Sequence, residues 1–86
     1  MHEARLMRDL MARIEAVARA EGGARVTGVR VWLGALSHFS PAHFREHFVD
    51  ASAGTLAQGA EVACELSDDM NHTDAQGVRL VSVDVQ

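Results

Sequence analysis

The chain has 86 residues, 48% of them hydrophobic, and a formal net charge of −4. This length and composition predict one globular domain, residues 1–86, near the small end of what folds without disulfides or metals. The acidic balance argues against nucleic acid as a partner, because no basic patch is present to meet phosphates.

The cysteine count and the start of the chain also indicate the cellular compartment. One cysteine, Cys64, excludes an intramolecular disulfide and a zinc site built from cysteines alone, and it fits a reducing environment. The chain starts without the basic and apolar regions of a signal peptide, and no apolar run is long enough to span a membrane. We therefore expect a cytoplasmic protein with no membrane partner.

The first three residues, Met1, His2 and Glu3, place several nitrogen donors next to one another. The free α-amine, the two amide nitrogens that follow it and the His2 imidazole can all reach one metal ion. Planar coordination by nitrogen is typical of Ni(II) or Cu(II), so the tripeptide is a candidate metal site. A histidine at this position can also be a solvated residue without a role.

Residues 3–21 predict an amphipathic helix, because apolar residues recur there at spacings of three and four. The stripe consists of Leu6, Leu10, Ile14 and Val17, widened by Met7, Met11 and Ala18. Residues 25–33 alternate instead and predict a half-buried strand, with Val29, Val31 and Leu33 on one face and Arg30 and Trp32 on the other. We expect Trp32 either to lie on the surface or to pack under a partner.

A second helix is expected at residues 41–52. The Ser40 side chain can cap it, Pro41 fits the first helical position, and Gly54 can end it. The residues expected on its buried side are Phe44, Phe48 and Ala51.

Two more strands are expected, at residues 60–66 and 78–85. Their inward-facing residues should be Val62, Cys64 and Leu66 in the first and Val81, Val83 and Val85 in the second. The polar segment Ser67–Gln76 lacks periodicity and predicts a loop, so we expect the two strands to form an antiparallel hairpin. The order α-β-α-β-β predicts an α+β two-layer sandwich, with two helices on one face of a small mixed three-stranded sheet.

Several segments together carry a resemblance to a known family. They are MHE at the start, LGALS at 33–37, SP at 40–41 and GTLAQGAEV at 54–62, in the same order of elements. The chain resembles the HypA (HybF) family of nickel-insertion accessory proteins, which serve the maturation of nickel–iron hydrogenase and urease. The resemblance covers residues 1–66 and 77–86.

The resemblance implies a nickel metallochaperone that holds Ni(II) transiently at its N-terminus, through Met1, His2 and Glu3. It also implies transfer of the ion to a hydrogenase large subunit or another nickel-enzyme precursor, with a GTP-dependent nickel-binding accessory protein as a second partner. No nucleophile elbow, phosphate-binding glycine motif or pair of carboxylates at a defined spacing appears, so we expect no enzyme activity.

The chain departs from the family between the last two expected strands. The family carries there a zinc-binding segment with two Cys-x-x-Cys pairs, and the loop at residues 67–76 takes its place. With a single cysteine, we expect no structural zinc. An alternative therefore stays open: a zinc-free interaction module, or a subunit of an enzyme complex, that transfers no metal and binds a partner or a second copy of itself through the sheet or its edge.

The remaining histidines and acids allow two readings each. His43 and His47 lie four apart on the expected second helix, a spacing that can bind a metal or leave a partly exposed pair without function. His38, in the turn before that helix, can approach the N-terminus. The expected loop carries either a ligand cluster or a solvated tip, made of Asp68, Asp69, His72 and Asp74.

Overall fold

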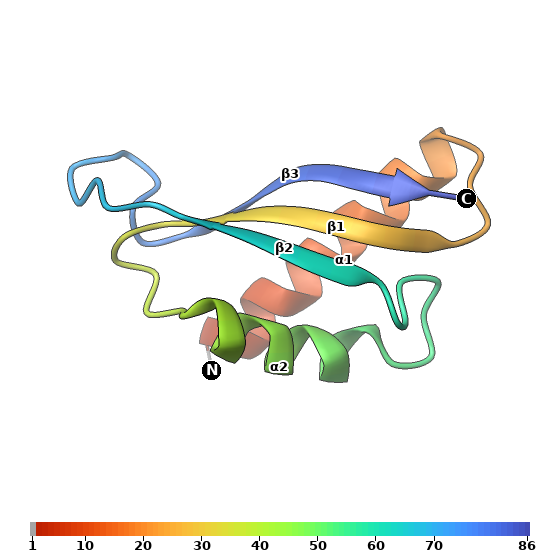
Figure 1. Cartoon of the computed structure of the whole chain (residues 1–86), viewed down its shortest axis with the longest axis horizontal. Coiled ribbons are helices and arrows are strands. Elements are labelled where there is room, and N and C mark those ends of the chain that lie inside the picture. Colours follow the sequence, from red (N-terminus) through yellow and green to blue (C-terminus); the bar gives the residue numbers. More distant parts are fainter. Residues whose placement is uncertain (1) are drawn as a thin grey trace.

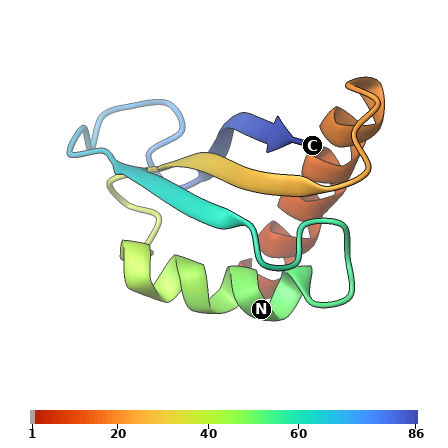
Figure 2. The same cartoon turned by 45° about the vertical axis from the view of Figure 1, so that its right-hand side comes forward.

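The structure, a computed structural model, describes the backbone of residues 2–86 and the side chains of residues 3–86. The elements are α1 (His2–Ala20), β1 (Val26–Leu33), α2 (Pro41–Ser52), β2 (Glu61–Leu66) and β3 (Val78–Val85), in that order. Both helices lie on the same face of the three-stranded sheet (Figure 1, Figure 2). The expected α+β two-layer architecture is confirmed.

Strand β1 is the centre of the sheet. The strand order is β2-β1-β3, with β2 parallel and β3 antiparallel to β1. The expected hairpin between the last two strands is therefore wrong, because β1 lies between them. The β1–α2–β2 segment is a parallel crossover unit that carries α2 over the sheet. This unit occupies one edge of β1, and β3 pairs with the other edge, where it packs against α1.

The core lies between the helices and β1. From α1 it takes Met7, Leu10, Met11, Ile14 and Ala18, each at most 6% exposed. Val17, by contrast, is 37% exposed, so its expected place in the buried stripe is wrong. Four of these residues, Met7, Met11, Ile14 and Ala18, are spaced four, three and four apart along the helix, and Val17 lies to one side of that line. From α2 the core takes Phe44 and Phe48, as expected, with Ala51 half-buried.

The two edge strands depart from the expected alternation at one residue each. Leu66, the last residue of β2, is 60% exposed rather than inward-facing. Val81 is 52% exposed, because the register between β1 and β3 shifts there. Arg30 pairs with Ser82 and the next residue of β1 pairs with Leu80, so Leu80 takes the inward position and Val81 is the extra residue of a bulge.

The expected start and end of α2 are confirmed. The Ser40 hydroxyl accepts a hydrogen bond from the His43 amide at 3.1 Å, and Pro41 opens α2. Gly22 after α1 and Gly54 after α2 have φ angles of 71° and 78°, the left-handed region that glycine adopts without a steric penalty.

The segment between β2 and β3 crosses the end of β1. The Ser67 amide donates to the Leu33 carbonyl at 2.9 Å, and the Gly34 amide donates to the Gly77 carbonyl at 2.9 Å. Its two ends are therefore anchored to the same strand end, on opposite edges, about 10 Å apart at two strand spacings. The nine residues between Ser67 and Gly77 are long enough to close this gap.

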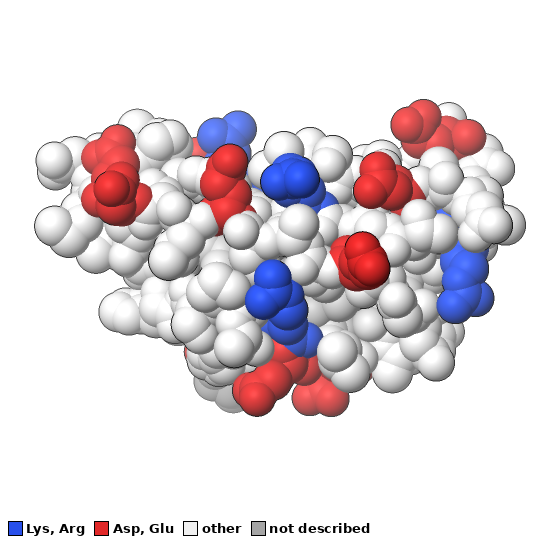
Figure 3. Space-filling model, viewed as in Figure 1, with Lys and Arg blue, Asp and Glu red and all other residues white. Residues whose placement is uncertain are grey.

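On the face seen in Figure 3, acidic and basic side chains are interspersed and form no basic patch. Among the described residues, neither helix has the length and apolar character that crossing a bilayer requires.

We predict that Gly34→Ala destabilises the fold by about 1–3 kcal/mol, because overpacking against a backbone that cannot move aside carries a cost of this order. A Cβ at Gly34 would lie 2.6 Å from the carbonyl carbon of Ala75 and 2.7 Å from the carbonyl oxygen of Asp74. The matched control is Gly77→Ala, whose Cβ would come no closer than 3.6 Å to the Asp74 oxygen. Urea unfolding measures both variants, and equal midpoints would contradict the close approach.

Candidate metal centre

Three side chains meet where the start of α1 passes α2: Glu3, His43 and His47. The Nε2 atoms of His43 and His47 are 2.9 Å apart. A carboxylate oxygen of Glu3 lies 3.3 Å from the His47 nitrogen and 3.9 Å from the His43 nitrogen. Within the described part of the chain, this is the one set of three or more metal-ligating side chains whose donor atoms converge.

The helices explain why these residues meet. Residues four apart on a helix share a face, so His43 and His47 point the same way from α2. Each directly precedes a buried phenylalanine, which places the histidines at the rim of the core and leaves their side chains 39% and 35% exposed. Glu3, in the first turn of α1, is brought to them because the two helices pack against each other.

Phe39 packs against both imidazoles. Its ring centroid is 5.3 Å from that of His43 and 5.9 Å from that of His47, the second in an edge-to-face arrangement. Phe39 is itself 6% exposed and makes an edge contact with Phe44 at 5.5 Å. A buried aromatic ring against the two imidazoles restricts their rotamers and so holds them in orientation.

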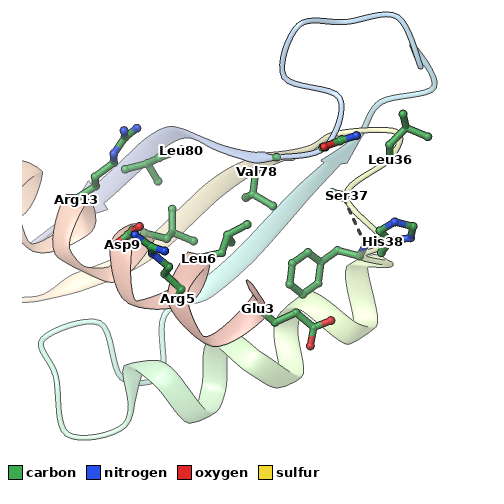
Figure 4. A pocket seen from close by; sticks show the side chains of 14 residues that line it. Glu3, Arg5, Leu6, Asp9, Arg13, Leu36, Ser37, His38, Val78 and Leu80 are labelled. Carbon is green, nitrogen blue, oxygen red and sulfur yellow. Dashed lines mark hydrogen bonds between the residues drawn. The ribbon is translucent and has the colours of Figure 1, made fainter. Parts of the chain in front are cut away.

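A groove of about 640 Å³ runs from the start of α1 along β3. Figure 4 shows Glu3 at one end of this groove, with Leu6, Val78 and Leu80 along its apolar side. His38 lines the groove too, and its approach to the N-terminus stays a prediction, because Met1 and the side chain of His2 lie outside the described residues. His38 has a φ of 65°, which is uncommon for a residue other than glycine and costs backbone strain.

The N-terminal donors can be located only in part. Met1 and the side chain of His2 lie outside the described residues. The backbone of His2 begins α1, and Glu3 is half-buried in the first helical turn. The carboxylate of Glu3 therefore points to α2, whereas its amide belongs to the candidate N-terminal chelate.

In the segment between β2 and β3, acidic residues and the histidine make hydrogen bonds and an ion pair with nearby residues of the chain. The Nδ1 atom of His72 accepts the Asp74 amide at 2.9 Å, and the Asp74 carboxylate lies 3.6 Å from Arg79. Asp69 accepts the amide of Asn71 at 3.0 Å. The reading of this segment as a solvated tip is the one that the contacts support.

Sequence reasoning missed the part that Glu3 plays in this centre. It gave Glu3 a place only in the N-terminal chelate, and it left the histidine pair on α2 without a third ligand. The spacing of His43 and His47 was the available signal. The third ligand comes from the packing of two helices, which local patterns do not determine.

The sequence model of one protein family matches residues 1–82, and this family is described as "Hydrogenase/urease nickel incorporation, metallochaperone, hypA". The chain belongs to the HypA family. Its start, with the MHE tripeptide, lies inside the matched region.

Curated HypA-family proteins are similar in sequence. Hydrogenase maturation factor HypA of Chlorobium limicola is 37% identical over 65 residues, 76% of this chain and 56% of that protein. Hydrogenase maturation factor HypA of Chlorobaculum tepidum is 31% identical over 77 residues, 90% of this chain and 68% of that protein. Hydrogenase maturation factor HybF of Salmonella typhimurium is 44% identical over 62 residues, 72% of this chain and 55% of that protein. The matched region thus spans little more than half the length of the first and third relatives.

Solved HypA structures share the fold. The solution structure of the Ni metallochaperone HypA from Helicobacter pylori has a TM-score of 0.78 at 16% identity, covering 96% of this chain and 96% of that chain. A second solution structure of a HypA protein has a TM-score of 0.69 at 18% identity, covering 100% of this chain and 97% of that chain. The arrangement of two helices on a mixed three-stranded sheet is therefore the HypA fold.

Cys64 on β2 is half-buried beside the core. Burial raises the pKa of its thiol, and the nearby Arg45 guanidinium opposes part of this effect. A raised pKa means that the fold favours the protonated thiol. The resulting contribution to stability is full below the pKa of the unfolded chain and is lost as the pH rises through the folded pKa.

We predict that iodoacetamide alkylates Cys64 more slowly in the folded protein than in the urea-unfolded chain at about pH 8, because less thiolate is present and access is lower. Arg45→Ala should slow the folded reaction further, since it removes the charge that lowers the pKa. Arg79→Ala, on β3, is the matched control and should change nothing. Mass spectrometry follows the reaction, and equal rates with and without urea would contradict the assignment.

Proposed function

We propose that this chain is a nickel metallochaperone-type accessory protein, which binds Ni(II) through Met1, His2 and Glu3 for the maturation of a nickel enzyme such as a nickel–iron hydrogenase. The observation that carries the proposal is the match to the nickel-incorporation family over residues 1–82, which begins at the tripeptide itself. The names of the curated relatives, hydrogenase maturation factors HypA and HybF, support the same function.

The start of α1 suits such a chelate. The first four amides of a helix have no intrahelical acceptor, so the amides of His2 and Glu3 can lose their protons without breaking the helix. The resulting amidate anions would lie at the positive end of the helix dipole, which favours negative charge. Two amidates also offset the charge of a divalent ion, so the complex as a whole adds little net charge there.

The partners that we propose are a hydrogenase large subunit or other nickel-enzyme precursor and a GTP-dependent nickel-binding accessory protein, in the cytoplasm. We propose a carrier without catalytic activity, formed by one domain at residues 1–86. We also propose that it has no structural zinc of the cysteine type. The single cysteine cannot supply such a site, and the segment at residues 67–76 closes directly over the end of β1.

The reading as a zinc-free interaction module rests on the missing zinc segment together with Trp32 on the open face of the sheet. In the structure the Trp32 ring packs against His72 of the same chain, with ring centroids 4.8 Å apart, and the tryptophan is half-buried. His72, in the segment between β2 and β3, thus partly covers Trp32 on the open face of the sheet. The missing zinc segment still favours the module, whereas the match to the nickel-incorporation family over residues 1–82 favours the nickel carrier.

We predict that His2→Ala weakens Ni(II) binding by more than about a hundredfold, since losing a direct ligand should exceed the 10–100-fold loss typical of outer-shell changes. Adding one glycine before Met1 should do the same, because it moves the α-amine away. Binding should also weaken steeply as the pH falls, since the amine, imidazole and amides must give up protons. Calorimetry and the absorption band of planar Ni(II) measure these effects on untagged protein.

The matched control is His72→Ala. It removes a histidine from the segment between β2 and β3, which takes no part in the proposed chelate, and it should leave Ni(II) affinity unchanged. If His2→Ala binds Ni(II) as tightly as the parent protein, the N-terminal chelate is not the nickel site and the proposal fails.

A further inference from the structure

The Glu3–His43–His47 centre has the dimensions of an ion-binding site. The three donor atoms are 2.9, 3.3 and 3.9 Å apart. The point in the plane of the three atoms that is equidistant from them lies about 2.0 Å from each, which is the bond length of zinc to imidazole nitrogen and carboxylate oxygen. Tetrahedral bonds of this length place the ligand atoms about 3.3 Å apart, so the Glu3 oxygen and the His43 nitrogen must approach each other slightly. The side chains are already arranged around a space of the size of the ion.

Hydrogen bonds alone leave at least one of the short contacts between these three atoms without a proton between donor and acceptor. With neutral imidazoles, each Nε2 atom is either a donor or an acceptor, and the Glu3 carboxylate only accepts. If His43 donates to His47, the single lone pair of the His47 nitrogen accepts that proton, and His47 has no Nε2–H to donate to the Glu3 carboxylate 3.3 Å away. A cation between the three atoms meets all three lone pairs at once.

The chemistry of the donors selects the class of ion. Two imidazoles and one carboxylate, with one position left open, form a set that zinc uses in tetrahedral sites. The three side chains are between 35% and 43% exposed, so an ion can enter from solvent and a water molecule can take the fourth position. This set differs from the planar amine and amide nitrogens expected at the N-terminus, which suit Ni(II) or Cu(II).

We propose that Glu3, His43 and His47 form a second divalent-cation site, which binds a Zn(II)-type ion in tetrahedral geometry and links the start of α1 to α2. The ligand atoms are the Glu3 carboxylate and the two Nε2 atoms. None of them belongs to the N-terminal chelate, which uses backbone nitrogens and the His2 imidazole. The site therefore does not rest on the proposed nickel function.

Zn(II) titration against a chromophoric chelator tests the site. The parent protein should bind one Zn(II) at this centre, and His43→Gln and His47→Gln should each weaken that binding at least about tenfold, or 1.4 kcal/mol. Glutamine keeps the bulk of these partly exposed side chains, and the melting curve of each metal-free variant checks the fold. Glu3→Gln should weaken Zn(II) binding while leaving Ni(II) binding intact, because it removes the carboxylate and keeps the amide.

Two controls separate this site from the nickel site. His72→Gln and His2→Ala should both bind Zn(II) as the parent does. Added Zn(II) should also raise the melting temperature of the parent and not that of His47→Gln, since the ion binds only the folded arrangement. The proposal is overturned if His47→Gln binds Zn(II) as tightly as the parent, or if His2→Ala abolishes Zn(II) binding. A failure of the nickel test with His2→Ala leaves this result unaffected.

Discussion

The burial of β1 beneath two helices is the constraint on which the rest of the molecule depends. Phe44, Phe48 and Ile14 are at most 1% exposed, and full burial of each such side chain stabilises the fold by about 1.5–3 kcal/mol. The contacts of Glu3 with the histidines are more than one-third exposed, where ion pairs contribute at most about 1 kcal/mol. The apolar core thus positions the metal-ligating side chains, and their mutual attraction adds little.

Much of the fold follows from local patterns. The apolar stripe of α1, the alternation in the strands, and the capping serine and following glycine of α2 predict all five elements to within one residue at each end. Local patterns do not determine which strands pair. The last two strands are neighbours in sequence, which favours a hairpin, but α2 carries β2 to one edge of β1 and leaves β3 to pair with the other. The exposure of Val81 has the same origin, because a bulge depends on the register between two strands.

The candidate site was predictable to a different degree for each of its residues. The order of donors at the start of the chain can be read directly from the sequence, because the ligands are consecutive. The pairing of His43 with His47 follows from helix periodicity. The approach of Glu3 to that pair requires the packing of α1 on α2, and the orientation of the imidazoles requires Phe39, a residue of the preceding turn. These two features depend on tertiary structure, so local sequence patterns could not show them.

The two sets of donors also differ in how they relate to folding. The N-terminal chelate needs only consecutive residues, so an unfolded chain can form it nearly as well, and an ion bound there shifts the folding equilibrium little. The set of Glu3, His43 and His47 exists only when α1 lies against α2, so an ion bound there stabilises the fold by its own binding free energy. A carrier gains from the first property, because it can hold and release its cargo without changing its stability. The second property suits an ion that remains bound while the protein is folded. Glu3 belongs to both sets, through its amide nitrogen in the first and its carboxylate in the second.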